Sequence, residues 1–153
     1  MEQIASFQVD HTKLRPGLYL SRQDGAVVTY DLRLKIPNTG DLLSNAEMHS
    51  TEHLIATLLR SSPQKDGVIY FGPMGCQTGF YFLADGSRLD HQEVIDLLRQ
   101  VFAAGAAYQG EMPGASAAEC GNYRSLSLDD ARRTCAFYAD VIRDWTVERL
   151  TYE

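Results

Sequence analysis

The stretch VTYDLRLKIPNTGDLLSNAEMHSTEHLIATLLR, residues 28–60, carries a strand signal followed directly by a helix signal. In residues 28–36 apolar and polar side chains alternate, and this period of two predicts a half-buried strand. Its expected inward face is Val28, Tyr30, Leu32, Leu34 and Ile36, and its outward face is Thr29, Asp31, Arg33 and Lys35. The turn residues 37–40 end the strand. A helix is predicted from Ser44, with Glu47 completing a capping box, to Arg60, before Ser61-Ser62-Pro63.

The flanking sequence adds strands and two further helices. Strands are expected at residues 4–9, where alternation is weak, at 18–21, at 68–71 and at 79–83, with a hairpin turn at 23–25. One helix should start at a cap made by Asp90 and Glu93, and the last at Ser127, with an apolar stripe through Cys135, Tyr138, Val141, Ile142 and Trp145. Residues 105–122 read mostly as loop. This order predicts an α+β fold, a mainly antiparallel sheet with helices packed on one face, in a single domain spanning residues 1–153.

Composition excludes several classes of function. The net charge of -6 argues against a nucleic-acid partner, which usually needs a basic face. No signal peptide is visible in residues 1–10, and no apolar run approaches the roughly 18–20 residues that span a membrane. Three cysteines, an odd number, make a disulfide framework unexpected. We therefore expect a cytoplasmic protein, without a membrane partner, whose reduced thiols can bind metal or do chemistry.

The central motif is His49-Ser50-Thr51-Glu52-His53 on the predicted helix. Residues four apart share a helix face, so His49 and His53 can present two imidazoles to one metal, with Glu52 beside them as acid or base. Helix phase places Glu52 within an apolar arc of Met48, Ile55, Leu58 and Leu59, and both histidines at its edge. The same HxxEH pattern marks one class of metallopeptidases, and two histidines can also simply flank an ordinary helix face. The motif therefore keeps an HxxEH-type metallopeptidase open as one function of this chain, an alternative to the one that the further motifs below indicate.

A metal site with two helical histidines needs at least one further protein ligand. The candidates are His11, His91, Cys76, Cys120, Cys135 and several carboxylates. Cys135 lies on an apolar stripe and is expected to be a small core residue, and His91 is expected to be exposed. Cys120 lies in a loop before Gly121, and Cys76 in a tight turn, so either can present a thiolate. The residues by themselves leave open which cysteine is the ligand and which the catalyst.

Taken together, the motifs resemble the S-ribosylhomocysteine lyase (LuxS) family over nearly the whole chain. The matching pieces are Ser6-Phe7, Asp10-His11-Thr12, Tyr30-Asp31-Leu32-Arg33, Pro37-Asn38, His49-Ser50-Thr51-Glu52-His53-Leu54, Gly72-Pro73-Met74-Gly75-Cys76 and Glu119-Cys120-Gly121-Asn122-Tyr123. The combination of HxxEH, PMGC and ECG in this order is far more specific than any one motif.

The resemblance implies roles for these residues. His49, His53 and Cys120 would bind one divalent metal per subunit, Fe(II) natively or Zn(II) as often isolated. Cys76 and Glu52 would be the two acid/base catalysts. The substrate S-ribosylhomocysteine would be bound by Ser6, His11, Arg33 and Arg60, with Arg33 near Cys76.

The resemblance also implies an activity and an assembly. The reaction would yield homocysteine and 4,5-dihydroxy-2,3-pentanedione, the precursor of autoinducer-2, which links the chain to quorum sensing and the methyl cycle. The family is a homodimer with two sites at the interface, where N-terminal residues reach the partner's metal site.

The chain departs from the family pattern at two places. Tyr70-Phe71-Gly72 stands where the family usually has Asp-x-Ser before PMGC, and the family's aspartate helps to hold the amino-acid end of homocysteine. Thr51 stands where the family usually has Leu. A lyase acting on a related thioether sugar is therefore a second alternative, although Arg60 remains available for the substrate's carboxylate.

Overall fold

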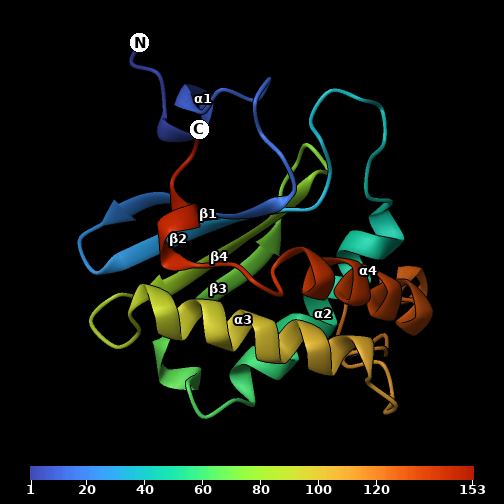
Figure 1. Cartoon of the computed structure of the whole chain (residues 1–153). Coiled ribbons are helices and arrows are strands. Elements are labelled where there is room, and N and C mark those ends of the chain that lie inside the picture. The colour runs from blue at the N-terminus through green and yellow to red at the C-terminus, as the bar shows by residue number, and fades with distance from the viewer.

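The computed structural model describes residues 1–153 and is built on one four-stranded antiparallel sheet in the order β1-β2-β4-β3. The strands are β1 (Gly17–Asp24), β2 (Val27–Arg33), β3 (Val68–Pro73) and β4 (Gly79–Asp85). Helices α2 (Asn45–Arg60), α3 (His91–Ala106) and α4 (Leu128–Val141) pack together on one face of the sheet, whereas α1 (Ala5–Gln8) lies apart from them, near the C-terminus (Figure 1). The predicted α+β fold is confirmed.

The core lies between the sheet and these three helices. Tyr30 and Leu32 of β2 and Phe80 and Phe82 of β4 are completely buried, as the period of two requires for one face of paired strands. From the helix side, Phe102 of α3 packs edge-on against Tyr138 of α4, with ring centroids 4.8 Å apart. Helix α2 contacts β3, α3 and α4, and this packing fixes the direction of its histidines.

Two predicted helix starts are confirmed in atomic detail. The Ser44 hydroxyl accepts from the Glu47 N–H at 3.0 Å, and the Glu47 carboxylate accepts from the Ser44 N–H at 2.8 Å. Asp90 and Glu93 make the same reciprocal pair at the start of α3. Each cap accepts hydrogen bonds from backbone N–H groups in the first turn, which have no carbonyl of a preceding turn as partner. It stabilises the helix by about 1 kcal/mol.

The strand predicted at residues 4–9 is wrong. Residues 5–8 form the single-turn helix α1, closed by a bond from the Phe7 N–H to the Ile4 carbonyl at 3.0 Å. No neighbouring strand offers these residues a ladder, and the apolar Ile4 and Phe7 are both exposed, at 54% and 67%. A weak alternation with neither a partner nor a buried face does not fix a strand.

The strand at residues 28–36 is shorter and more buried than predicted. It ends at Arg33, because β4 begins at Gly79 and the N–H groups of Leu34 and Lys35 both turn to the carbonyl of Thr78. On its outward face Asp31 and Arg33 are only 1% and 3% exposed. Alternation identified the inward face correctly for Val28, Tyr30, Leu32 and Leu34, but Ile36, also predicted to face inward, lies past the end of the strand and is 42% exposed. It also missed that other segments cover the outward face.

The C-terminal segment reaches the outward face from the helix layer. Helix α4 ends at Val141, so Trp145, predicted to lie on its stripe, falls in the following turn, although it is buried. The short 3-10 helix Val147–Leu150 then contacts both α3 and the edge strand β1.

None of the helices combines the length and the apolar composition that a membrane crossing needs.

Candidate metal centre and catalytic cavity

His49, His53 and Cys120 come together at one point. Each offers a ligand atom, and these atoms all lie within 4.8 Å of one another. The two histidines are one turn apart on α2 with their rings perpendicular, and Cys120 approaches from the loop before α4 with its sulfur 3.4 Å from His49 Nε2. A tetrahedral zinc ion bound by nitrogen at about 2.0–2.1 Å and sulfur at about 2.3 Å needs a separation of about 3.5 Å between these two atoms. The donor set therefore fits a divalent metal.

Hydrogen bonds orient both imidazoles toward this point. His53 Nδ1 lies 2.8 Å from the carbonyl oxygen of Pro113, which can only accept, so Nδ1 carries the proton and Nε2 keeps its lone pair. His49 Nδ1 lies 2.6 Å from the Ser125 hydroxyl, and that hydroxyl donates its own proton to the Asn122 carbonyl at 3.1 Å. Both histidines are thus fixed as Nε2 ligands, and such outer partners raise metal affinity.

The chain around the third ligand is shaped for close approach. The backbone N–H of Asn122 donates to the Cys120 sulfur at 3.4 Å, an interaction that favours a thiolate. Beside His53, Gly114 has a φ of +69°, and a Cβ there would lie 2.9 Å from His53 Nδ1. Only glycine accommodates both the left-handed backbone and this contact.

Glu52 lies on the same helix, between the two histidines in sequence. The buried face of α2 comprises Ser50, Thr51, Leu54, Ile55 and Leu59, so it is rotated relative to the predicted apolar arc. Glu52 consequently sits half-buried at the edge of that face, next to the histidines, rather than inside it. Its role as an acid/base catalyst stays a prediction.

A second cluster surrounds Cys76, which is exposed in the turn between β3 and β4. Arg33 Nη1 lies 3.9 Å from the Cys76 sulfur and donates to the Thr78 hydroxyl at 2.8 Å. Because the Thr78 oxygen accepts from Arg33, its proton is free for the Cys76 sulfur, 3.0 Å away. The predicted proximity of Arg33 and Cys76 agrees with this geometry.

Arg33 is held as a cation by its surroundings. Burial on its own lowers the pKa of the guanidinium, but the Asp31 carboxylate and the Cys76 sulfur outweigh burial and raise that pKa. The Asp31–Arg33 pair is bidentate, with bonds of 3.1 and 2.7 Å, and the side chains are only 2% and 3% exposed. A permanent positive charge therefore lies beside the sulfur.

The cavity at Cys76 also contains the predicted substrate-binding residues Ser6, His11 and Arg33. It measures about 190 Å³. Its lining is completed by Phe7, Met74, Gly75 and Tyr81 and includes none of the three clustered metal-ligand candidates. Apart from Glu52 and Arg60, the predicted site residues thus fall into two groups within one chain.

Three other predicted candidates have different surroundings. The guanidinium of Arg60 donates to the carbonyls of Val68 and Ile69 at 2.9 and 2.8 Å, so its role toward a substrate stays a prediction. His91 is half-buried rather than exposed, and its Nδ1 lies 2.6 Å from the Tyr30 hydroxyl. Cys135 is fully buried in the core, as predicted.

Comparison with known proteins matches the chain almost end to end. The family model for S-ribosylhomocysteinase (LuxS) covers residues 4–148. The chain belongs to the LuxS family. It is 42% identical to the S-ribosylhomocysteine lyase of Finegoldia magna over 156 aligned positions, and 43% identical to that of Desulfotalea psychrophila over 158, with 99% of each chain covered in both cases. The lyase of Borreliella afzelii is 40% identical over 157 positions. Between the alternatives left by the HxxEH motif, membership of the LuxS family favours the lyase over a metallopeptidase.

Some residues that shape the LuxS-type site carried no signal in the sequence. Ser125 and Pro113 act through a hydroxyl and a backbone carbonyl on distant loops, and Thr78 acts through its contact with Arg33. Only Gly114, in the Pro113-Gly114 pair, had a local signature, and that signature indicates a turn rather than a metal site.

Proposed function

We propose that the protein is an S-ribosylhomocysteine lyase, which cleaves S-ribosylhomocysteine to homocysteine and 4,5-dihydroxy-2,3-pentanedione, the precursor of autoinducer-2. The observation that carries the proposal is the convergence of His49, His53 and Cys120 on one point in a chain that matches the LuxS family over residues 4–148. The second cluster, at Cys76, supplies the remaining acid/base group.

The reaction requires protons to move between neighbouring carbons of the sugar. The carbonyl first migrates from C1 to C3. Removal of the C4 proton then forms a C4–C5 double bond as the C5–S bond breaks, and the sulfur leaves as the thiol of homocysteine. The enol left behind tautomerises to the diketone. Each transfer needs a base that takes the proton and an acid that returns it. We assign these roles to Glu52 and Cys76, with Arg33 and Thr78 holding the sulfur in place. Ser6 and His11 line the same cavity and are assigned to substrate binding.

His49, His53 and Cys120 would hold one divalent metal per subunit. A divalent metal bound there supplies Lewis-acid polarisation of the sugar carbonyl. Two imidazoles and one thiolate suit both Fe(II), which we propose as the native metal, and Zn(II). Metal analysis of protein purified without oxygen decides between them, and a site filled by neither ion would contradict the assignment.

We further propose that residues 1–153 form one lyase domain that acts as a homodimer with its sites at the interface. Cys76 and the metal ligands line different places in one chain, and the exposed Ile4 and Phe7 give the N-terminal segment an apolar surface. A second copy can then bring Cys76 to the other subunit's metal ligands. Three free thiols suit a cytoplasmic location, which completes the proposal.

Mixing two inactive variants tests the shared site. Cys76→Ala keeps the metal ligands, and His49→Ala keeps the thiol. If sites form between subunits, a statistical mixture contains half heterodimers with one intact site of two, and should recover about a quarter of the wild-type activity. Mixtures that stay inactive after subunit exchange would show that each site lies within one chain.

Release of free thiol from S-ribosylhomocysteine tests the activity itself. The wild-type protein, purified without oxygen, should release thiol, and Cys76→Ala should abolish the release. Cys135→Ala is the matched control, because it removes a cysteine from the core and should leave turnover intact. No release from folded, metal-loaded wild-type protein would overturn the proposal.

A related thioether sugar is a second candidate substrate, because of Tyr70. This residue lines a cavity of about 340 Å³ that shares Ser6 and Tyr81 with the Cys76 cavity. A tyrosine offers no negative charge to the substrate's ammonium group. If recognition of that group is impaired, Tyr70→Asp should lower the KM for S-ribosylhomocysteine and not that for an analogue without the amino group. An unchanged KM would mean that the ammonium is bound elsewhere.

A further inference from the structure

The ion pair between Asp31 and Arg33 is buried on the face of the sheet that α2, α3 and α4 do not cover. Their side chains are 2% and 3% exposed. A buried ion pair is favourable only if its remaining donors and acceptors are also satisfied, because both charges have lost their water. The groups that complete these hydrogen bonds therefore control how firmly the pair is held.

One of these groups comes from the C-terminus. The Tyr152 hydroxyl donates to Asp31 Oδ2 at 2.7 Å, on the same oxygen that accepts from Arg33 Nη2. At the other end of the pair, Arg33 Nη1 contacts Thr78 and Cys76 at 2.8 and 3.9 Å. An unbroken series of polar contacts thus runs from Tyr152 to the sulfur of Cys76.

Tyr152 is well placed to act as a fixed donor. Its ring stacks on Tyr19 with centroids 5.0 Å apart, and Tyr19 in turn packs edge-on against Trp145 at 5.8 Å. Burial, followed by the Asp31 carboxylate, raises the pKa of Tyr152, so its phenol stays protonated and can only donate to that carboxylate.

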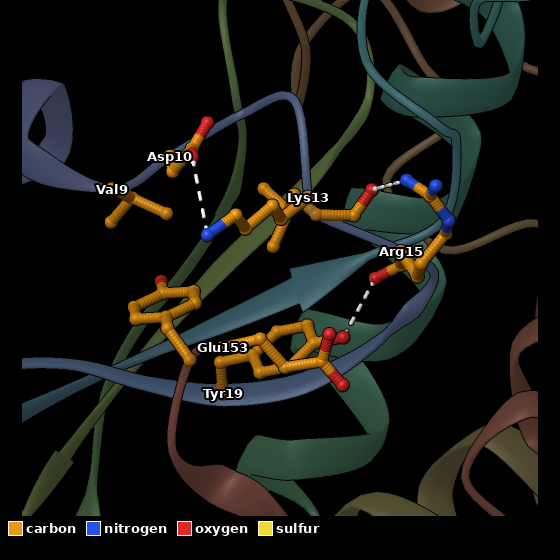
Figure 2. A pocket seen from close by; sticks show the side chains of 8 residues that line it. Val9, Asp10, Lys13, Arg15, Tyr19 and Glu153 are labelled. Atoms are coloured by element: carbon orange, nitrogen blue, oxygen red, sulfur yellow. Dashed lines mark hydrogen bonds and ion pairs between the residues drawn. The ribbon is translucent and has the colours of Figure 1, made fainter.

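The tail that carries Tyr152 is also packed against the segment that precedes β1. Tyr152 and Glu153 line a cavity of about 40 Å³ together with Val9, Asp10, Lys13, Leu14, Arg15 and Tyr19. In Figure 2 Glu153 and Tyr19 lie on one side of this small cavity and Val9, Asp10 and Lys13 on the other, with an ion pair between Lys13 and Asp10. The same segment contains His11, which lines the Cys76 cavity. The tail therefore lies close to the segment that carries His11 and is bonded to the ion pair that carries Arg33.

We infer that Tyr152 is a positioning residue for the proposed lyase reaction, fixing Arg33 beside Cys76 through its hydrogen bond to Asp31. The inference rests on the proposed function. Without the Tyr152 hydroxyl, Asp31 Oδ2 loses a donor, the ion pair is free to tilt, and Arg33 moves away from the sulfur and Thr78. Ser6 and His11, which are assigned to substrate binding, are unchanged, and Arg33 stays in the cavity wall as a cation, so the effect falls on turnover more than on binding.

Tyr152→Phe tests this, because it removes one hydroxyl and keeps the stacked ring. It should lower kcat roughly tenfold and leave KM within about twofold, since a small displacement of a reacting group costs rate more than affinity. The matched control is Tyr19→Phe, which removes a hydroxyl from the neighbouring ring, where it donates to the Arg15 carbonyl and not to Asp31. That variant should keep the wild-type kcat.

A second readout does not depend on turnover. The rate at which iodoacetamide alkylates Cys76, followed on its peptide by mass spectrometry, should fall in Tyr152→Phe and stay unchanged in Tyr19→Phe. Equal losses in both variants would mean that the hydroxyls act through general stability, and unchanged rates in Tyr152→Phe would remove its positioning role. If the wild-type protein releases no thiol from S-ribosylhomocysteine, the proposed function fails, and the alkylation rates still decide the role of Tyr152.

Discussion

Gly114→Ala should weaken metal binding without preventing folding. Gly114 has a φ of +69°, and an added Cβ would meet His53 at 2.9 Å from Nδ1 and 3.0 Å from Cε1. Carbon and ring atoms do not approach so closely, so the imidazole must turn. Turning it breaks the 2.8 Å bond from Nδ1 to the Pro113 carbonyl and takes Nε2 away from the other two ligands.

The magnitude has two separable parts. An alanine in the left-handed region costs about 1–2 kcal/mol of folding free energy, which for a chain of this size lowers the melting temperature by about 2–4 °C per kcal/mol. Loss of the hydrogen bond that orients a ligating histidine typically reduces metal affinity about 10- to 100-fold. The first part is a property of the backbone, and only the second depends on His53.

Gly25→Ala provides the matched control. Gly25 has a φ of +61° in the β1–β2 turn, and a Cβ there would meet nothing within 4 Å. Both variants should therefore lose thermal stability as metal-free proteins, Gly114→Ala by about 1 kcal/mol more because it also breaks the bond between His53 and Pro113. Only Gly114→Ala should lose affinity for Zn(II) in competition with a chromophoric chelator. Equal Zn(II) affinities for the two variants would refute the assigned role of Gly114 and of the bond it protects.

Three further outcomes follow from the same geometry. Glu52→Gln should lower the rate of thiol release at least about 100-fold while Zn(II) affinity stays the same, because Glu52 is assigned to proton transfer and not to the metal; a parallel loss of affinity would make it a ligand instead. Thr51→Val should raise the free energy of unfolding by about 1 kcal/mol, seen as a higher melting temperature, because the buried Thr51 hydroxyl has no hydrogen-bond partner; a lower melting temperature would mean that the hydroxyl is satisfied. Burial raises the pKa of Cys135 from 9.0 to about 12, so its thiol stays neutral in the folded protein and should resist thiol reagents at pH 8; rapid labelling of Cys135 in the native state would contradict this. The free energy of unfolding should fall as the pH rises from 9 to 12, because in that range the thiol ionises only in the unfolded chain.

The sequence determined the parts that depend on neighbours along the chain. The start of α2 at Ser44 follows from one capping box, and the pairing of His49 with His53 follows from the pitch of the helix. The inward face of β2 follows from its alternation. Such features are local, so the residues that specify them are present in a short window. The family motifs, taken together, identified the family, which no single window specifies.

Only the tertiary structure decided what lies beside these local features. Cys120 reaches His49 across 71 residues of chain, and the bond that His49 Nδ1 donates to Ser125, which sets the His49 tautomer, spans 76. The outward face of β2 looked polar and solvated in the sequence, yet Asp31 and Arg33 are buried, and Tyr152, 121 residues away from Asp31, donates a hydrogen bond to the Asp31 carboxylate. Hydrogen bonds between such distant residues depend on how the helices, sheet and terminal segments pack, and no periodicity along the chain records that packing.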